Sequence, residues 1–243
     1  MTSCRIGCAG WSLPKSFSAA FPRDGSHLER YSSVFDCVEI NSSFYRSHMP
    51  QTYARWSASV PARFRFSVKL PRAITHEARL KSPGKLLDRF FGEVEPLGKK
   101  LGCVLVQLPP SLAFDRAVVH RALKAIRART DKSIVVEPRH ATWFATDANE
   151  MLTEYAIGRV AADPAMVPLA AQPGGDPAFV YFRWHGSPKI YYSNYDAARL
   201  RSLAKDLRNA QKSAREVWCV FDNTTLGFAT GNALELRRYM RRA

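Results

Sequence analysis

The sequence has no apolar run of membrane-spanning length, since every hydrophobic stretch is interrupted before the roughly 18 residues that a bilayer-crossing helix needs. Residues 1–10 also lack the basic run and the sustained apolar segment of a secretory signal. No low-complexity tract breaks the composition. We therefore expect a protein of the cytoplasm.

Cysteine is sparse and irregularly spaced. The five cysteines form an odd set without a C-x-x-C pair, which argues against a disulfide framework and a structural zinc site. Most of them fall within or just before apolar runs, so we expect buried free thiols. They are Cys4, Cys8, Cys37, Cys103 and Cys219.

Common nucleotide-binding and hydrolase motifs are also missing. The chain contains no G-x-x-x-x-G-K-[ST], no G-x-G-x-x-G and no G-x-S-x-G. These motifs cradle phosphates, bind dinucleotides or carry a nucleophilic serine. Their absence disfavours P-loop nucleoside triphosphatases, Rossmann-type enzymes and α/β-hydrolases.

Negative charge is in short supply. The 36 lysines and arginines outnumber the 21 aspartates and glutamates and give a formal net charge of +15. Such an excess indicates either a polyanionic partner such as nucleic acid or a solvated basic surface. The densest basic run, on a predicted C-terminal helix where cations favour the helix dipole, comprises Arg237, Arg238, Arg241 and Arg242.

What the sequence does contain is an alternation of strands and helices. Eight short runs rich in β-branched and apolar residues predict strands; they are Cys4–Cys8, Cys37–Asn41, Phe64–Leu70, Cys103–Leu108, Ser133–Glu137, Gly158–Asp163, Phe179–Trp184 and Val217–Asp222. Helical patterns lie between most of them, with start signals that include a Ser26 and Glu29 capping box, Ser82 before Pro83, Asp115 and Asp196.

This alternation predicts parallel strands with right-handed crossovers. Eight repeats in 243 residues favour a closed (β/α)8 TIM-type barrel over an open doubly wound sheet, and one domain spanning residues 1–243. Residues 164–177 are rich in proline and glycine and lack a helical pattern. We expect a long loop there in place of the sixth helix.

Polar residues end seven of the eight predicted strands, at Glu39 and Asn41, Lys69, Gln107, Glu137 with Arg139 and His140, Asp163, Arg183 with His185, and Asp222 with Asn223. In a parallel barrel these ends share one rim, where active sites of this architecture are built. Because residues two apart point to the same side of a strand, Glu137 and Arg139 form one such pair, and Arg183 and His185 another.

These strand ends are also where the chain resembles a family, the YecE-like "domain of unknown function 72" (DUF72) barrels. The matching pieces are Ile6–Trp11, Val38–Arg46, Phe66–Lys69 with Thr75 and His76, Gln107–Pro110, Val136–His140 with Trp143, Arg183–Gly186 and Phe221–Thr224. The chain departs from the family pattern at Ala20-Phe21-Pro22 and at Asp222-Asn223. The resemblance implies a TIM-type barrel and no established activity.

The strand-end residues suit acid–base chemistry on an anion. Two carboxylates from different strands can divide acid and base roles while the cations stabilise negative charge, and arginines suit carboxylate or phosphate. We predict the catalytic residues to be Glu39, Lys69, Glu137 and His185. Predicted substrate contacts are Trp11, Asn41, Gln107, Arg139, Trp143, Arg183 and Asn223, with an ion pair to Glu137 as the alternative role of Arg139.

We expect no metal and no cofactor, because a lysine and several arginines lie among the carboxylates at the strand ends and their positive charge disfavours a bound cation. A divalent metal held by His76, His140 or His185 together with Asp163, Asp222 or the glutamates remains the alternative.

Three classes of function stay open. The leading hypothesis is an enzyme, an isomerase, lyase or hydrolase, that acts on a small polar anion such as a phosphorylated or acidic sugar. The second is a nucleic-acid phosphodiesterase or nucleic-acid-binding protein, which the charge of +15 would favour. The third is a non-catalytic ligand sensor. No membrane partner is expected.

Overall fold

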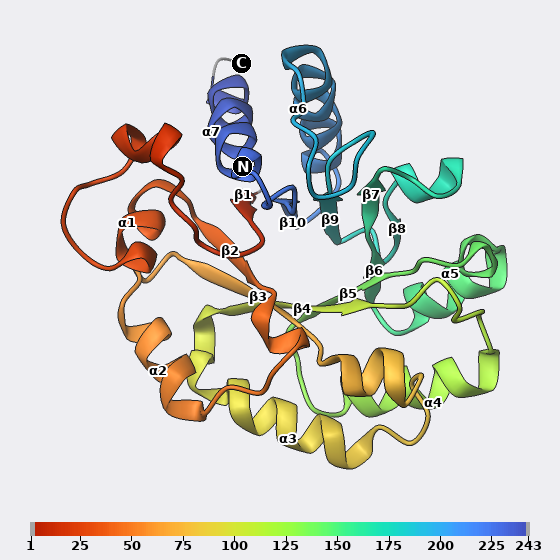
Figure 1. The fold of residues 1–243 in the computed structure, drawn as a ribbon. Coiled ribbons are helices and arrows are strands. Elements are labelled where there is room, and N and C mark those ends of the chain that lie inside the picture. Colours follow the sequence, from red (N-terminus) through yellow and green to blue (C-terminus); the bar gives the residue numbers. More distant parts are fainter. Residues whose placement is uncertain (1–2, 242–243) are drawn as a thin grey trace.

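Strands and helices alternate along residues 3–241, the part of the chain that the computed structural model describes (Figure 1). The strands are β1 (Ser3–Cys8), β2 (Cys37–Ile40), β3 (Arg65–Lys69), β4 (Leu101–Gln107), β5 (Ser133–Glu137), β6 (Ile157–Arg159), β7 (Ala161–Asp163), β8 (Gly174–Gly175), β9 (Phe179–Trp184) and β10 (Glu216–Phe221). The helices, which lie outside the strands, are α1 (His27–Val34), α2 (Pro50–Ala58), α3 (Gly84–Val94), α4 (Arg116–Arg127), α5 (Thr146–Glu154), α6 (Ala197–Gln211) and α7 (Phe228–Arg241).

The predicted helix starts are confirmed at three of four positions. Ser26 accepts a hydrogen bond from the Glu29 N–H at 3.3 Å, and the Glu29 carboxylate accepts one from the Ser26 N–H at 2.7 Å. Asp115 and Asp196 cap α4 and α6, and each side chain accepts a hydrogen bond from a backbone N–H in the first turn. The prediction for Ser82 is wrong in detail: α3 begins after Pro83 without a side-chain cap.

All eight predicted runs coincide with strands whose ends differ from the prediction by at most two residues, and the sixth is divided. Residues 164–177 contain a short 3₁₀ turn at Pro168–Ala171 and β8, and no α-helix. At the C-terminus, Arg238 and Arg241 lie in the last turn of α7, whereas Arg242 falls outside the described residues.

The strands form two sheets, in the orders β1-β10-β9-β7 and β2-β3-β4-β5-β6-β8. Every pair is parallel except β6 with β8. The fold is therefore a mixed α/β fold with largely parallel sheets, in which all the long strands point the same way.

The two sheets meet at two seams. At the first, a single bridge joins Ala9 to Glu39, next to a 2.9 Å hydrogen bond from the Gly10 N–H to the Glu39 carbonyl. At the second, the chain changes sheets at Val160: the preceding strand β6 pairs with β5, and the following strand β7 pairs with β9.

Glycine allows the close approach at both seams. A Cβ on Gly7 of β1 would lie 2.2 Å from the Cys37 carbonyl oxygen of β2. A Cβ on Gly158 of β6 would lie 2.7 Å from the Phe179 carbonyl oxygen of β9. Any larger residue would have to push the strands apart.

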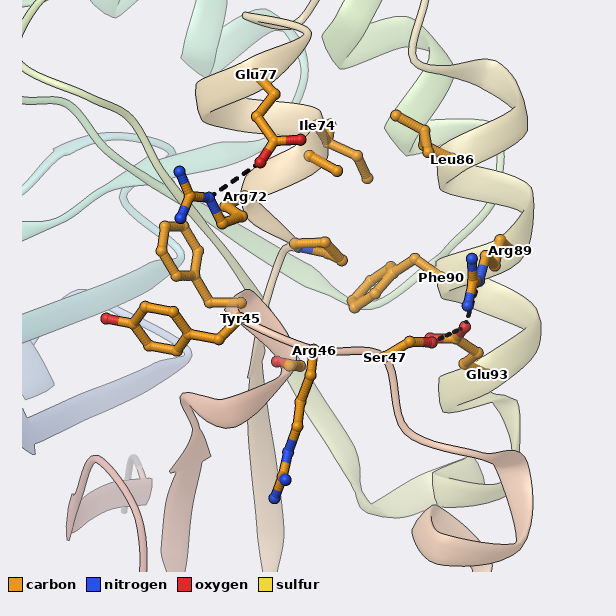
Figure 2. Close-up of a pocket in the computed structure, with 14 residues that line it drawn as sticks. Tyr45, Arg46, Ser47, Arg72, Ile74, Glu77, Leu86, Arg89, Phe90 and Glu93 are labelled. Carbon is orange, nitrogen blue, oxygen red and sulfur yellow. Dashed lines mark hydrogen bonds and ion pairs between the residues drawn. The ribbon is translucent and has the colours of Figure 1, made fainter.

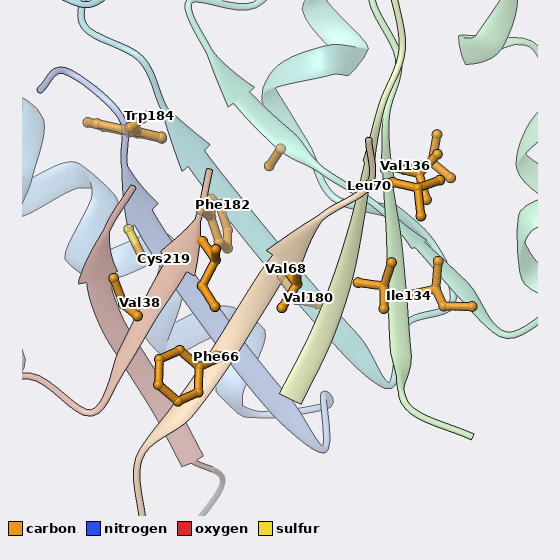
Figure 3. Close-up of a cluster of buried hydrophobic side chains, with 14 of the residues drawn as sticks. Val38, Phe66, Val68, Leu70, Ile134, Val136, Val180, Phe182, Trp184 and Cys219 are labelled. Atoms are coloured by element: carbon orange, nitrogen blue, oxygen red, sulfur yellow. The ribbon is translucent and has the colours of Figure 1, made fainter. Parts of the chain in front are cut away.

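Successive residues along the strands enter two different cores. One set packs under the helices, as Val38, Val68, Val136 and Phe182 do in Figure 3. The alternate set forms a second cluster, in which the two sheets face each other: Cys37, Cys103, Leu105, Val135, Val160, Phe179, Tyr181, Trp218 and Val220. The period of two that places these residues inside also decides where the polar residues at the strand ends point.

Candidate functional site

The polar residues at the ends of the strands continue the inner face. Glu39 follows Cys37 on β2 by two residues, Glu137 follows Val135 on β5, and Arg183 follows Tyr181 on β9. These three side chains are fully buried, at 0% exposure. The inner apolar cluster therefore ends, toward the carboxyl ends of the strands, in a layer of charged groups.

Arg183 is the centre of this layer. Its Nε and Nη2 donate to the two carboxylate oxygens of Glu39 at 2.9 and 2.7 Å. Nη1 donates to Glu137 at 3.1 Å, and Nη2 lies 2.9 Å from Asp222. Although burial opposes the charge, the carboxylates Asp222, Glu39 and Glu137 raise the pKa of Arg183 well above its ordinary value.

The guanidinium is enclosed by partners inside the protein. Nη1 also lies 3.3 Å from the His185 ring, and each of the three nitrogens of Arg183 contacts at least one carboxylate. A fully buried side chain that is paired in this way is poorly placed to contact a bound anion. Arg183 instead holds the carboxylates in place.

Glu137 joins the central arginine to a second one. Arg139 donates to Glu137 Oε1 through Nε at 3.0 Å and Nη2 at 2.7 Å, and its side chain keeps 21% exposure. Burial alone would raise the pKa of Glu137, but the charges of Arg139, His185 and Arg183 outweigh it and hold that pKa well below the ordinary value. The ion pair predicted as the alternative role of Arg139 is thus present, while its side chain stays partly exposed.

His185 lies between two carboxylates. Nε2 is 2.8 Å from Glu137 Oε1, and Nδ1 is 3.1 Å from Asp222 Oδ2. Each ring nitrogen also lies near an arginine nitrogen, that of Arg139 at 3.0 Å and that of Arg183 at 3.3 Å. Because carboxylates accept and arginines donate, both ring nitrogens lie within reach of a hydrogen-bond acceptor and a donor. Such a histidine is well placed to move a proton.

Lys69 stands apart from these pairs. Its side chain is buried, at 4% exposure, and Nζ lies 4.1 Å from the centre of the Phe44 ring. Among residues 3–241 no carboxylate comes within ion-pair distance of it. Burial, and then the charge of Arg183, lower the pKa of Lys69 to about 8, against the opposing effect of the carboxylates.

The charges of the layer balance. Three carboxylates, those of Glu39, Glu137 and Asp222, face three cations, those of Lys69, Arg139 and Arg183. The pairing is uneven, however. Arg183 takes contacts from all three carboxylates, and Lys69 takes none.

The remaining predicted site residues differ in their surroundings. Gln107 ends β4 at 9% exposure, and Asn41 Oδ1 is buried without a hydrogen-bond partner among the described residues. Trp11 packs edge-on against Trp56 at 5.1 Å and lines a hollow of about 290 Å³ together with Asn41.

Two residues predicted to contact the substrate, Trp143 and Asn223, form hydrogen bonds within the protein instead. Trp143 is fully buried, with its indole N–H donating to the Leu112 carbonyl at 2.9 Å, and it therefore offers no face to a ligand. Asn223 Nδ2 donates to Ser193 and Asn232, although Asn223 Oδ1 has no partner among the described residues. In both cases the tertiary contacts favour a structural role over a ligand contact.

Two residues of the metal alternative, Asp163 and His140, have partners outside the charged layer. Asp163 accepts hydrogen bonds from Tyr195 and Arg199, and the His140 ring bonds to Thr142 at 2.9 Å. Within residues 3–241 no group of three or more histidine, cysteine, aspartate or glutamate side chains is arranged to hold a metal ion.

Sequence reasoning missed two members of the layer, Tyr181 and Ser67. The Tyr181 hydroxyl donates to Glu39 at 3.0 Å and lies 3.3 Å from Ser67. Asp222, which the sequence placed at a strand end but not among the predicted catalytic or substrate contacts, completes the set around Arg183. A signal was available, since Tyr181 precedes Arg183 by two residues and so shares its side of β9. Phe44, in the 3₁₀ turn Ser42–Phe44, had no such signal, because it reaches Lys69 from another loop.

A separate groove of about 280 Å³ lies beside the charged layer (Figure 2). It runs between the loop after β2, the loop after β3 and α3, and four of its charged lining residues form two ion pairs: Arg72 with Glu77 at 3.1 Å, and Arg89 with Glu93 at 2.8 Å. Phe44 lines this groove as well as facing Lys69, so its ring is shared by the groove and the charged layer.

No helix within residues 3–241 combines the length and the apolar character needed to cross a bilayer. The five cysteines are free thiols, and four of them are buried.

Comparisons with known proteins agree with one another. Protein YecE of Escherichia coli K12 is 30% identical over 175 residues, which cover 68% of this chain and 61% of the relative. The chain thus spans less than two thirds of that relative's length. Protein YunF of Bacillus subtilis is 25% identical, with 95% of this chain and 92% of the relative covered.

A solved structure from Thermotoga maritima, described as a DUF72 family protein, superposes with a TM-score of 0.81 at 25% identity, over 98% of this chain and 99% of that one. The family model described as "Protein of unknown function DUF72" matches residues 5–243. The match runs through every strand end that contributes to the charged layer, and the chain belongs to the DUF72 family.

Proposed function

We propose that this protein is a cytoplasmic enzyme that uses acid–base and electrostatic catalysis on a small polar anion, such as a phosphorylated or acidic sugar. The observation that carries the proposal is the buried charged layer at the carboxyl ends of the strands. Burying this many charges is costly, and a layer that served stability alone could be replaced by apolar side chains at no loss.

The proposal includes a single-domain, closed (β/α)8 barrel, in which the two sheets join at both seams. In favour of closure are the Ala9–Glu39 bridge at one seam and the change of partner at Val160 at the other. The shared inner cluster also favours it, because that cluster draws side chains from both sheets. In such a barrel the charged layer occupies the end where enzymes of this architecture bind substrate.

The roles follow from which charged groups are already paired within the protein and which are still able to contact a ligand. Arg183 positions Glu39, Glu137 and Asp222, since it is fully buried and each of its nitrogens already contacts a carboxylate. Lys69 and Arg139 attract the anion, Lys69 because no carboxylate of the described residues pairs with it and Arg139 because part of its side chain stays exposed. This assignment moves the anion contact predicted for Arg183 to these two residues.

Glu137 and His185, 2.8 Å apart, exchange a proton with the bound molecule. A ligand sensor would need the cations that attract the anion but not this pair of groups. Turnover of any anion that the protein binds would therefore separate an enzyme from a sensor.

The test is thermal stabilisation by anions. Phosphate or sulfate at low ionic strength should raise the melting temperature by mass action, whereas chloride at equal ionic strength should not. Lys69→Met should lose most of that increase. The matched control is Lys85→Met, which changes an exposed lysine on α3 and should keep it. If phosphate and sulfate leave the melting temperature of the native protein unchanged, the proposal of an anionic substrate is wrong.

A further inference from the structure

Lys69 combines burial with the lack of a polar partner for its amine. Lys100 Nζ donates to the carbonyls of Ser57 and Val60 at 2.5 and 2.7 Å, and Lys132 pairs with Asp131 at 3.2 Å. Lys69 Nζ has neither kind of partner among the described residues and lies 4.1 Å from the centre of the Phe44 ring. Lys189 Nζ also lies over a ring, that of Tyr192, but Lys189 is exposed, whereas Lys69 is buried. When it loses its proton, the Lys69 amine therefore has a lone pair that no other group of the described residues engages.

The position of this amine is fixed by the backbone around it. The Ser43 hydroxyl lies 2.7 Å from the Lys69 carbonyl and 2.9 Å from the Ile40 carbonyl, which ties the end of β3 to the end of β2. Phe44, the next residue, places its ring over Nζ. Lys69 is therefore held at the end of its strand by the same turn that covers it.

The surroundings make the uncharged amine easier to reach than in an exposed lysine. Burial and the nearby charge of Arg183 bring the pKa of Lys69 to about 8, so the amine is still mainly charged at neutral pH, but its uncharged form is far more populated than that of an ordinary lysine. His76, edge-on to Phe44 at 4.9 Å, is affected in the same direction: burial, then the charges of Lys69 and Arg72, lower its pKa. Desolvation of a lysine in this way is a recognised route to a nucleophilic amine.

We propose that Lys69 is a covalent nucleophile, whose Nζ condenses with the carbonyl group of a small aldehyde or ketone that carries a phosphate or carboxylate. The inference rests on the proposed function and names its substrate class. It is carried by a buried, unpaired amine held beside a layer that contains a histidine between two carboxylates.

The step balances without an oxidant or a reductant. The Nζ lone pair attacks the carbonyl carbon, the C=O π electrons pass to oxygen, and a proton moves from nitrogen to that oxygen to give a carbinolamine. One further proton, supplied by the His185–Glu137 pair, lets the hydroxyl leave as water, and the nitrogen lone pair forms the C=N bond of an iminium ion. The iminium withdraws electrons from the neighbouring carbon, which suits an isomerase or a lyase, and water reverses the condensation.

The experiment is reductive trapping with defined probes. The native protein is incubated with glycolaldehyde phosphate or glyoxylate and treated with sodium borohydride, and the adduct is located by intact-mass measurement and peptide mapping. We expect one adduct per chain, on Lys69, whose yield saturates with probe and increases several-fold between pH 6 and pH 8 as the amine loses its proton.

Two variants control for non-specific labelling. Lys69→Arg keeps the charge but cannot form the adduct, so its yield should fall to background. Lys100→Arg alters another partly buried lysine, one whose amine is hydrogen-bonded to two carbonyls, and should label like the native protein. Should Lys69→Arg fold poorly, the peptide map of the native protein still decides the question. Labelling spread over exposed lysines, with Lys69 unmodified, would overturn the proposal.

A third probe separates this inference from the proposed function. Neutral glycolaldehyde has the carbonyl but no charge. If phosphate stabilises the protein and no probe labels Lys69, the covalent role is wrong while anion binding stands. If glycolaldehyde labels Lys69 as well as its phosphate ester does, and phosphate gives no stabilisation, the covalent role stands and the anionic substrate is wrong.

Discussion

Arg183 lies fully buried among three carboxylates, and its contacts decide the geometry of the whole charged layer. Buried ion pairs of this kind add little net stability, since desolvation offsets the attraction. Removing one partner is a different matter, because the charge that remains is then uncompensated. The residues around Arg183 should therefore tolerate substitution poorly, whatever their catalytic role.

Glu137→Gln tests this at a single residue. The change keeps the shape but leaves Arg139 and Arg183 short of a charge, so the free energy of unfolding at pH 7 should fall by about 3–5 kcal/mol. Glu154→Gln, an exposed position on α5, should change it by less than about 0.5 kcal/mol. Urea unfolding measures both variants.

The difference in stability between the native protein and Glu137→Gln should also depend on pH. The pKa of Glu137 is lower in the folded protein than in the unfolded chain, so its contribution is complete above the ordinary value near 4.5 and is lost as the pH falls through the folded value. The native protein should therefore lose stability in acid, and its advantage over Glu137→Gln should narrow below pH 4.5. An advantage that is constant from pH 7 to pH 3 would contradict the charge argument.

At the scale of elements, the seams between the sheets depend on close backbone contact. Gly7 and Gly158 lie where β1 meets β2 and where β6 meets β9, and neither position has room for a Cβ. At each of these positions the backbones of the two strands come close because the glycine has no side chain.

Gly158→Ala should therefore destabilise the protein. The new Cβ would lie 2.7 Å from the Phe179 carbonyl oxygen, a backbone atom that cannot turn aside, and overpacking of this kind costs about 1–3 kcal/mol. Gly92→Ala is the control, since that glycine lies within α3 with nothing within 4 Å of the added Cβ. It should gain roughly 0.5–1 kcal/mol from reduced backbone freedom. Equal melting temperatures for the two variants would show that the second seam is looser than described.

At the scale of the whole molecule, the excess charge lies outside the site. The charged layer balances three carboxylates against three cations, so the net charge of +15 belongs to the rest of the chain. A basic surface attracts any polyanion through released counterions, with an affinity that falls steeply as salt increases. That attraction differs physically from recognition in the site.

A salt series on duplex DNA distinguishes the two. We expect any binding seen at 50 mM NaCl to weaken at least about tenfold by 200 mM, and DNA to leave the reductive labelling of Lys69 unchanged. Salt-resistant binding, or cleavage of the DNA, would favour the nucleic-acid phosphodiesterase over the small-anion enzyme.

Local sequence was sufficient for the order of elements. The runs before Glu137 and Arg183 are apolar enough to identify β5 and β9 to the residue, and Asp115 and Asp196 cap their helices as predicted. Each of these signals lies within a few residues of what it determines. The break at Val160 and the strand β8 had no such signal, because they depend on which distant strand the backbone pairs with.

The sequence by itself determined that Glu39, Glu137, Arg183 and His185 lie at strand ends, and that residues two apart on one strand, such as Arg183 and His185, share a side, since a strand alternates its side chains with a period of two. Only the tertiary structure decided their partners. It surrounded Arg183 with three carboxylates, left Lys69 under Phe44 with no carboxylate of residues 3–241 within ion-pair distance, and enclosed Trp143 in the core. The physical reason is distance along the chain: Glu39 and Arg183 are 144 residues apart, and their contact depends on how the sheets meet, which no local pattern records.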